Sequence, residues 1–225
     1  AIYNPLPNDL HVPMTLAAAR AGKHVLCEKP MALSANEAAQ LREVAGLVHI
    51  QEAFMLRHHP QWLRARELVQ SGALGSVLSV QVFFSYFNRD PANIRNHVAQ
   101  GGGALYDIGC YPVVVGRFLW AVEPLRVSAV VQRDPQFHTD HTVSALLDFG
   151  LGRHLSFTVS TQSAPYQRVL VVGNQQRLEI DIPFNAPANA TTCIYLDDGS
   201  RLDGSSAVVQ TLPACDQYTL QADAF

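Results

Sequence analysis

Several features that would indicate a membrane protein or a metalloprotein are missing from this sequence of 225 residues. No apolar run approaches the roughly 20 residues needed to cross a bilayer. The four cysteines form no CxxC pair, which argues against a zinc site and for reduced, mostly buried thiols. Two histidine pairs, His58-His59 and His138-x-x-His141, lack a companion cysteine or carboxylate at zinc-site spacing. We therefore expect neither a membrane span nor a metal site.

Charge of either sign is also scarce. Only 16% of the residues are charged, the net charge is −3 and the pI is near 6.3. This balance gives no electrostatic case for binding nucleic acid or anionic membranes. The hydrophobic fraction of 48% fits a well-packed globular protein. No signal peptide is visible, and we expect a cytoplasmic location.

A third absence concerns the glycine-rich phosphate-binding turn of dinucleotide-binding domains. The sequence contains no G-x-G-x-x-G after a first strand. It starts at Ala1 without methionine, enters at once on the strand-like Ile2-Tyr3, and ends on an uncapped helix-like stretch, 216–225. We expect a fragment of a longer protein, with the phosphate-binding half of such a domain upstream of residue 1.

The first part of the chain alternates strands and helices. A helix is predicted over 12–21, followed by a buried strand over 24–27. Ser34 and Glu37 form a capping box that opens a helix through about Ala45, and 47–50 reads as another strand. This order predicts that residues 1–55 are part of a Rossmann-type, doubly wound parallel domain.

The character of the chain changes after residue 55. Helices are expected over 60–69 and 103–120, and residues 77–87 alternate apolar and polar side chains as a strand does. Further strands with turn signals between them are predicted at 126–133, 141–149, 153–161, 167–172, 177–182 and 191–197. We predict a second domain over 56–225, of the α+β class, with a mainly antiparallel sheet and helices on one face.

The tripeptide Glu28-Lys29-Pro30 directly follows the buried strand at 24–27. In open α/β sheets, ligands bind outside the carboxyl ends of the strands, so Lys29 is placed to meet a ligand. Pro30 restricts Lys29 to extended geometry and could aim its ammonium group. By itself the tripeptide fits an ordinary exposed loop lysine equally well.

A second motif runs from three glycines, 101–103, through Asp107 to Tyr111. The glycines allow the backbone to approach a ligand or a neighbouring element closely. Asp107 and Tyr111 are four positions apart on the helix they open, so their side chains share one face. A carboxylate and a phenol at that place suit a substrate with hydroxyl groups, although a tyrosine in such a helix is more often a core residue.

Together the two motifs and their spacing resemble the glucose–fructose oxidoreductase/inositol dehydrogenase family, the Gfo/Idh/MocA-type oxidoreductases. The resemblance covers essentially the whole chain. It includes Asn4-Pro5, His11, the segments 21–25 and 54–60, Glu28-Lys29-Pro30, and the run from Gly101 to Tyr111. Many members of the family carry histidine at position 111. The tyrosine found here is similar to the branch of glucose–fructose oxidoreductase, NADP-dependent xylose dehydrogenase and dihydrodiol dehydrogenase.

The resemblance implies a nicotinamide cofactor, NADP or NAD, and hydride transfer on a sugar or related polyol. It implies that Lys29, Asp107 and Tyr111 are catalytic, with Tyr111 as the proton donor and acceptor. It places Asn4, Pro5, Glu28, Lys29 and Pro30 at the cofactor.

Three expectations about the chemistry follow from these residue types. A nearby Lys29 ammonium should lower the pKa of Tyr111 and help it act as a base. Glu28 could pair with Lys29, or could face solvent. Arg95 could clamp a polar substrate, or could be a surface charge.

Two alternatives to a sugar or polyol dehydrogenase stay open at this point. One is a dihydrodiol dehydrogenase that acts on aromatic diols, and the other is a cofactor-binding regulator or sugar sensor without catalysis. The presence of Lys29, Asp107 and Tyr111 favours an enzyme. The apolar strands around Phe83, Phe87 and 153–172 predict an exposed sheet face that a second subunit covers, giving a homodimer or homotetramer.

Overall fold

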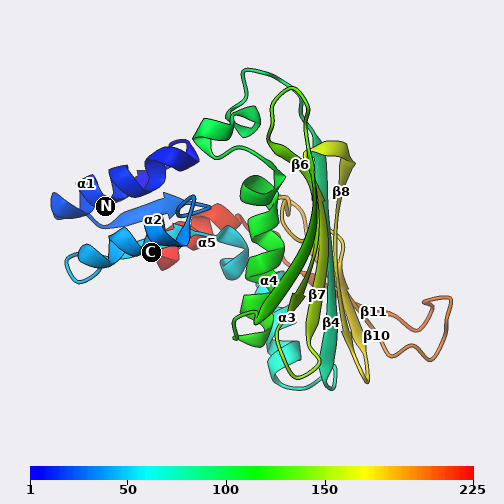
Figure 1. The fold of residues 1–225 in the computed structure, drawn as a ribbon. Helices are drawn as coiled ribbons and strands as arrows, with labels where there is room; N and C mark the ends of the chain where they lie inside the picture. Colours follow the sequence, from blue (N-terminus) through cyan, green and yellow to red (C-terminus); the bar gives the residue numbers. More distant parts are fainter.

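The computed structural model describes all residues from 1 to 225 and contains two sheets of different size and kind (Figure 1). The smaller sheet is parallel and has the order β1-β2-β3. The larger has eight strands in the order β11-β10-β9-β8-β4-β7-β6-β5. This confirms the predicted fold class, a Rossmann-type parallel sheet followed by a mainly antiparallel sheet with helices on one face.

The small sheet and its helices follow the predicted alternation. Its elements are β1 (Ile2–Asn4), α1 (His11–Arg20), β2 (Val25–Glu28), α2 (Ala35–Ala39) and β3 (Ile50–Ala53). Apolar residues of α1 and of the turn after α2 form its core, namely Val12, Leu16, Ala19, Leu41 and Val44. Both loops that follow β1 and β2 leave the sheet at its carboxyl edge, where ligands bind in this class of sheet.

Two predictions for this part need correction. The helix opened by Ser34 is short: Ser34 Oγ accepts from the Glu37 amide at 3.1 Å, but the α-helix ends at Ala39 and continues only as a tighter turn to Glu43. The third strand begins at Ile50, three residues later than predicted. Leu47 is largely exposed, and Ile50 is the residue that pairs with Val25 of β2.

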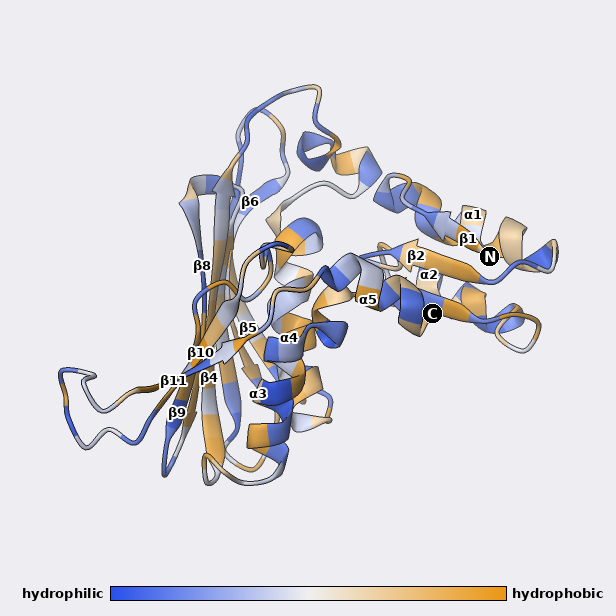
Figure 2. Cartoon of the chain, turned by 180° about the vertical axis from the view of Figure 1, so that it is seen from behind, coloured by the Kyte–Doolittle hydropathy of each residue, from blue (hydrophilic) through white to orange (hydrophobic).

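The large sheet has its helices on one face. The helical elements are η3 (Met55–His58), α3 (Pro60–Gln70), the π-helical turn η6 (Leu105–Gly109) and α4 (Cys110–Trp120). The strands are β4 (Val77–Phe87), β5 (Arg126–Arg133), β6 (Asp140–Asp148), β7 (His154–Ser160), β8 (Gln162–Gly173), β9 (Arg177–Ile180), β10 (Thr192–Asp197) and β11 (Val208–Leu212). Figure 1 shows α3 and α4 along one face of this sheet, and Figure 2 shows hydrophobic and hydrophilic residues mixed along its strands, whereas β2 is mostly hydrophobic.

The sequence pattern predicted most of these strands but not their order. β4, the first strand of this sheet along the chain, lies in its middle, where it pairs antiparallel with β8 and parallel with β7. β11 was not predicted, because its short run at the sheet edge is mostly exposed and lacks a clear alternation. The predicted helix 103–120 is split, since it begins with the π-helical turn η6 before α4.

The main core lies between the large sheet and its helices. It holds 30 buried residues, with Trp62, Phe149 and Phe184 among the largest. The last helix, α5 (Gln217–Ala224), returns toward the small sheet, and the ring of the final residue, Phe225, lies 5.1 Å from that of His49. The predicted domain boundary at residue 55 falls between β3 and η3 and stays a prediction.

No helix of the structure combines the length and the apolar character that a membrane crossing requires.

Candidate active site

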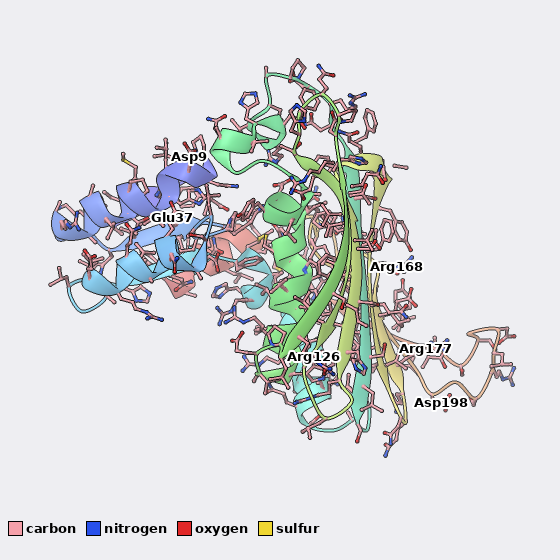
Figure 3. The ribbon with its side chains drawn as sticks, in the orientation of Figure 1. Asp9, Glu37, Arg126, Arg168, Arg177 and Asp198 are labelled. Carbon is pink, nitrogen blue, oxygen red and sulfur yellow. The ribbon has the colours of Figure 1, made fainter.

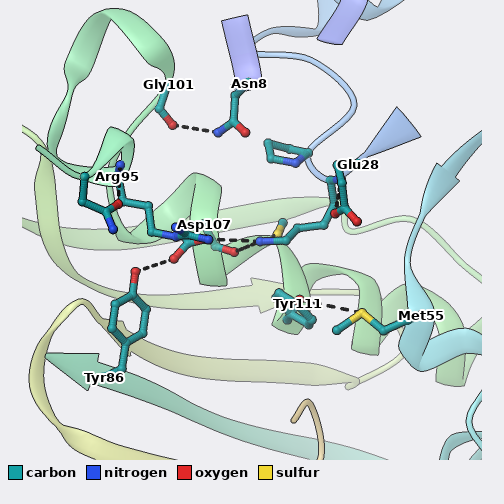
Figure 4. Close-up of polar contacts among 12 residues, drawn as sticks. Asn8, Glu28, Met55, Tyr86, Arg95, Gly101, Asp107 and Tyr111 are labelled. Atoms are coloured by element: carbon teal, nitrogen blue, oxygen red, sulfur yellow. Dashed lines mark hydrogen bonds and ion pairs between the residues drawn. The ribbon is translucent and has the colours of Figure 1, made fainter. Parts of the chain in front are cut away.

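The loop after β2 carries Lys29 to the start of the helix that lies against the large sheet. The Lys29 ammonium nitrogen donates to the backbone oxygen of Asp107 at 2.5 Å and lies 3.2 Å from Asp107 Oδ1 (Figure 4). Both side chains are mostly buried, with 14% of Lys29 and 11% of Asp107 exposed. The structure therefore brings together two of the predicted catalytic residues that are 78 positions apart.

Asp107 is the centre of a wider cluster. Arg95 Nε lies 3.0 Å from Oδ1, and the Tyr86 hydroxyl donates to Oδ2 at 2.5 Å. Burial by itself would raise the pKa of Asp107, but the charges of Lys29 and Arg95 outweigh it and hold that pKa below its ordinary value. Asp107 is thus a fixed carboxylate that accepts from three side chains.

The glycine motif explains how Arg95 and Asp107 are brought into contact. A Cβ atom on Gly102 would lie 2.5 Å from the backbone oxygen of Arg95, so only glycine lets these two segments pack this closely. Gly103 has φ of +116°, and its amide donates to the same Arg95 oxygen at 2.9 Å. Asp107 then falls in η6, a π-helical turn of the kind often found at functional sites.

Tyr111, on α4, is buried at the edge of the same cluster, with 6% of its surface exposed. The Lys29 ammonium nitrogen lies 5.1 Å from the centre of its ring, and Phe54, Phe84 and Phe184 surround it at centroid distances of 5.1 to 5.6 Å. Its hydroxyl has one partner, the Met55 sulfur at 3.8 Å. Lys29 and Tyr111 are therefore close neighbours, joined through the ring face rather than through the hydroxyl.

The expected effect of Lys29 on Tyr111 is not found. Burial raises the pKa of Tyr111 well above its ordinary value, and the neighbouring Cys110 thiol and Asp107 carboxylate add to the rise. The ammonium lies over the face of the Tyr111 ring and makes no hydrogen bond to the hydroxyl, so it does not offset the effect of burial on that oxygen. At neutral pH Tyr111 is a protonated phenol.

Glu28 does not form the side-chain pair with Lys29 that the sequence suggested. Its Oε1 accepts from the Tyr3 hydroxyl at 2.5 Å, and its Oε2 accepts from the Lys29 backbone amide at 3.2 Å. It therefore holds the backbone of the loop, while Asp107 holds the ammonium group of Lys29.

Two of the predicted cofactor residues, Asn4 and Pro30, make contacts within the protein, and their predicted role at the cofactor stays a prediction. Asn4 is buried, and its amide nitrogen lies within hydrogen-bond distance of the His11 backbone oxygen and Thr15 Oγ1, at 3.1 and 3.3 Å. Pro30 follows a cis peptide bond, and its carbonyl oxygen lies 2.7 Å from His11 Nδ1. Both residues organise the junction of β1, α1 and the Lys29 loop, and neither lines the two cavities at this cluster.

Two cavities meet at this cluster. The larger, about 890 Å³, lies between the small-sheet loops, α4 and the large sheet. The smaller, about 170 Å³, lies at the carboxyl ends of β1 and β2 and is lined by Pro5, Leu6 and Asn8 together with the glycine loop. Glu28, Lys29, Arg95 and Asp107 line both. The cluster thus stands where a cofactor in one cavity and a substrate in the other would come into contact.

Sequence reasoning missed Tyr86 and left the role of Arg95 undecided. The alternation of β4 puts Tyr86 on the same face as Phe84, but nothing in the sequence relates that strand to Asp107. No group of three or more histidine, cysteine, aspartate or glutamate side chains is arranged to hold a metal ion.

Comparisons with known proteins bear on the family of this chain. The family model described as "Oxidoreductase family, NAD-binding Rossmann fold" matches residues 1–49, and "GFO/IDH/MocA C-terminal domain" matches residues 62–179. An uncharacterized oxidoreductase of Rhizobium meliloti is 44% identical over the whole chain, which covers 68% of that protein. A D-xylose 1-dehydrogenase (NADP(+)) of Haloferax volcanii is 38% identical, with the same coverage.

A solved structure has the same fold. The 3-ketoreductase KijD10 from Actinomadura kijaniata, in complex with NADP and TDP-benzene, superposes with a TM-score of 0.89 at 31% identity. The alignment covers all of this chain and 68% of that one. The chain thus spans about two thirds of the length of the proteins it matches.

Proposed function

The chain belongs to the GFO/IDH/MocA family of NAD(P)-dependent oxidoreductases, and we propose that its substrate is an uncharged sugar or related polyol. One observation carries this proposal: the Lys29–Asp107 pair stands at the boundary of two cavities. When bound, the nicotinamide cofactor supplies or accepts the hydride. The residues of this chain bind and orient the substrate and handle its proton.

Lys29 is proposed to contact the reacting oxygen of the substrate. An ammonium group has three N–H donors, and two of them are accounted for by the backbone oxygen and Oδ1 of Asp107. One donor is left for a substrate hydroxyl or carbonyl oxygen. A fixed positive charge there stabilises the negative charge that develops on that oxygen during hydride transfer.

Tyr111 is proposed as the proton donor and acceptor. A thioether is a weak acceptor, so the contact with Met55 is easily exchanged for a substrate oxygen. Because burial keeps the phenol protonated, Tyr111 suits the direction in which a carbonyl is reduced and its oxygen receives a proton. In the reverse direction the phenol must first release its own proton, and the resulting phenolate would then take the substrate's hydroxyl proton.

The smaller cavity suits the nicotinamide end of the cofactor. Pro5 and Leu6 offer apolar contacts, Asn8 and the glycine loop offer polar ones, and the Lys29 side chain reaches across to the larger cavity. We propose that Pro5, Glu28 and Lys29 hold this end. Asn4 and Pro30 would act indirectly, by fixing the loops that carry these residues.

The charges of the larger cavity support an uncharged substrate. Its lining includes three basic residues, Lys29, Arg95 and Arg168, and three acidic ones, Glu28, Asp107 and Asp181. Lys29 and Arg95 are paired with Asp107, and Arg168 is paired with Glu179 and Asp181. Figure 3 shows Arg168 on the side of the large sheet away from the helices. Each of the three cations thus contacts a carboxylate, and the lining has no excess positive charge to attract a phosphate or diphosphate group.

A substrate panel tests the proposal. The intact protein is mixed with NADP or NAD and with aldoses, cyclitols, sugar phosphates, sugar nucleotides and aromatic diols, and reduced cofactor is followed by absorbance. We expect turnover of uncharged sugars or cyclitols. Turnover of charged sugars alone would overturn the charge argument, turnover of diols alone would identify a dihydrodiol dehydrogenase, and cofactor binding without any turnover would support a regulator.

The predicted homo-oligomer and cytoplasmic location stay predictions. The open face of the large sheet supports the first, because it carries exposed apolar residues around a depression of about 750 Å³, including Phe83, Leu146, Tyr166 and Val130, the last 76% exposed. We propose that a second copy covers this face. Sedimentation velocity of the intact protein should show a dimer or tetramer, and a monomer at all concentrations would contradict the proposal.

A further inference from the structure

Tyr86 contacts the Asp107 carboxylate through the oxygen that the two cations do not use. Its hydroxyl donates to Oδ2 at 2.5 Å, whereas Lys29 Nζ and Arg95 Nε lie 3.2 and 3.0 Å from Oδ1 (Figure 4). The two carboxylate oxygens therefore have different partners. Oδ1 meets two charged groups, and Oδ2 meets a single phenol.

Tyr86 is carried by a strand inside the large sheet. It belongs to β4, whose neighbouring residues Ser85 and Phe87 both pair with β8, and it stands at the register shift between them, the kind of irregularity that re-aims a side chain. Phe84, two residues earlier on the same face, is buried and stacks on Phe184 at 4.8 Å. Groups held on paired strands keep their positions better than groups on loops. Arg95 and Lys29, by contrast, come from a short turn and a loop.

We propose that Tyr86 is a positioning residue for the reaction: its hydroxyl anchors Asp107 Oδ2, so that Oδ1 holds the Lys29 ammonium at the boundary of the two cavities. The role rests on the proposed function of Lys29 and Asp107. Without the phenol, Oδ2 would be a buried acceptor with no partner, and the carboxylate would be free to rotate away from Lys29.

The electrostatic surroundings agree with a donor role for Tyr86. Burial and the adjacent Asp107 carboxylate raise the pKa of the Tyr86 hydroxyl, so it keeps its proton and donates at every working pH. The other titratable groups near Asp107 are Lys29, Arg95, Tyr111, and Cys110, whose sulfur lies 3.7 Å from the Asp107 backbone oxygen. None of these contacts reaches Oδ2.

The first experiment compares the Asp107 carboxyl in the intact wild-type protein and in Tyr86→Phe, by NMR of ¹³C-labelled aspartate between pH 7 and pH 2. Loss of a hydrogen bond to the charged form should move the Asp107 titration midpoint upward by about one pH unit. Tyr195→Phe, on β10, which β9 and β8 separate from β4 in the sheet, is the matched control and should leave the midpoint unchanged. An unchanged midpoint in Tyr86→Phe overturns the proposal.

The second experiment follows turnover of a substrate found with the panel above. Tyr86→Phe should lower kcat about 10- to 100-fold and leave the KM for cofactor unchanged. In the plot of kcat against pH, the fall on the acid side should shift to higher pH by the same interval as the Asp107 midpoint. An unchanged kcat, or an equal fall at every pH, would contradict the positioning role. If the wild-type protein turned over nothing on the panel, the proposed function would fail, while the titration would still decide whether Tyr86 anchors Asp107.

Discussion

The two sides of the candidate active site contribute chemistry of different kinds. The small parallel sheet supplies one cation, Lys29, from the loop after β2. The large-sheet side supplies a carboxylate and two phenols from regular elements: Asp107 from η6, Tyr86 from β4 and Tyr111 from α4. Both side-chain hydrogen bonds of Lys29 go to Asp107. The position of the loop residue is thus set by the opposite side of the site.

This difference matters because the Lys29–Asp107 pair is largely withdrawn from water. An exposed ion pair contributes little to stability, whereas the loss of one partner from a buried pair leaves an uncompensated charge. Charges near the Tyr111 ring and the cavity boundary therefore act more strongly than they would at the surface. A substitution that removes a group from one side therefore shows whether the other side can function without it.

The largest effect is expected from the small-sheet side. Lys29→Met removes the ammonium but keeps a long apolar side chain, so turnover should fall by about 1,000-fold or more while the fold is retained. Steady-state kinetics with a panel substrate and circular dichroism check the two parts. The control is Lys23→Met, at an exposed position just before β2, which should behave as wild type. Turnover of Lys29→Met within tenfold of wild type would remove Lys29 from the mechanism.

The matching change on the large-sheet side is Asp107→Asn. It leaves Lys29 and Arg95 without their counter-charge, and we expect the free energy of unfolding at pH 7 to fall by about 3 kcal/mol. The stabilisation depends on pH in a defined direction. Because the folded-state pKa of Asp107 lies below its ordinary value, the contribution is fully present above about pH 4 and is lost as the pH falls through that lowered value.

Urea unfolding from pH 7 to pH 3 measures this dependence. The difference between wild type and Asp107→Asn should stay constant down to about pH 5 and shrink below about pH 4. Asp203→Asn, in an exposed loop, serves as the control and should change the free energy of unfolding by less than about 0.5 kcal/mol. A difference that is the same at every pH would mean that Asp107 stabilises the protein through its shape and not through its charge.

The smallest change is the loss of one hydroxyl, in Tyr111→Phe. We expect kcat to fall about 100-fold, as for the loss of a general acid, with little change in stability because the hydroxyl has only the Met55 sulfur as partner. Kinetics and thermal unfolding measure the two quantities. A kcat equal to wild type would assign the proton transfer to Lys29 alone and would limit Tyr111 to forming the aromatic wall beside it.

Much of the fold could be predicted from local patterns. β4 and β5 begin and end where the alternation and turn signals predicted, and Ser34 and Gly22 mark a helix start and end. The central position of β4 could not be predicted, because it depends on pairing with residues of β7 and β8 that lie 75 to 96 positions further along the chain. Such long-range pairing has no local signal.

The candidate site, like the fold, has a part that could be predicted from the sequence and a part that could not. Lys29, Asp107 and Tyr111 were predicted as catalytic from residue types and family resemblance, and they do lie together. The direction of the Tyr111 pKa was predicted wrongly, because burial among aromatic rings outweighs the nearby ammonium. Tyr86 had no signal, since a tyrosine at the end of a strand is common and its contact with Asp107 arises only after folding.

By itself, the sequence determined which chemical groups this protein has and where they stand along each element: a lysine at the carboxyl end of a buried strand, and a carboxylate and a phenol four positions apart on one helix. Only the tertiary structure decided which of them touch. Lys29 pairs with Asp107 instead of Glu28, and Tyr86 joins them, because the packing of the small-sheet loops against α4 and the large sheet sets distances that no local pattern encodes.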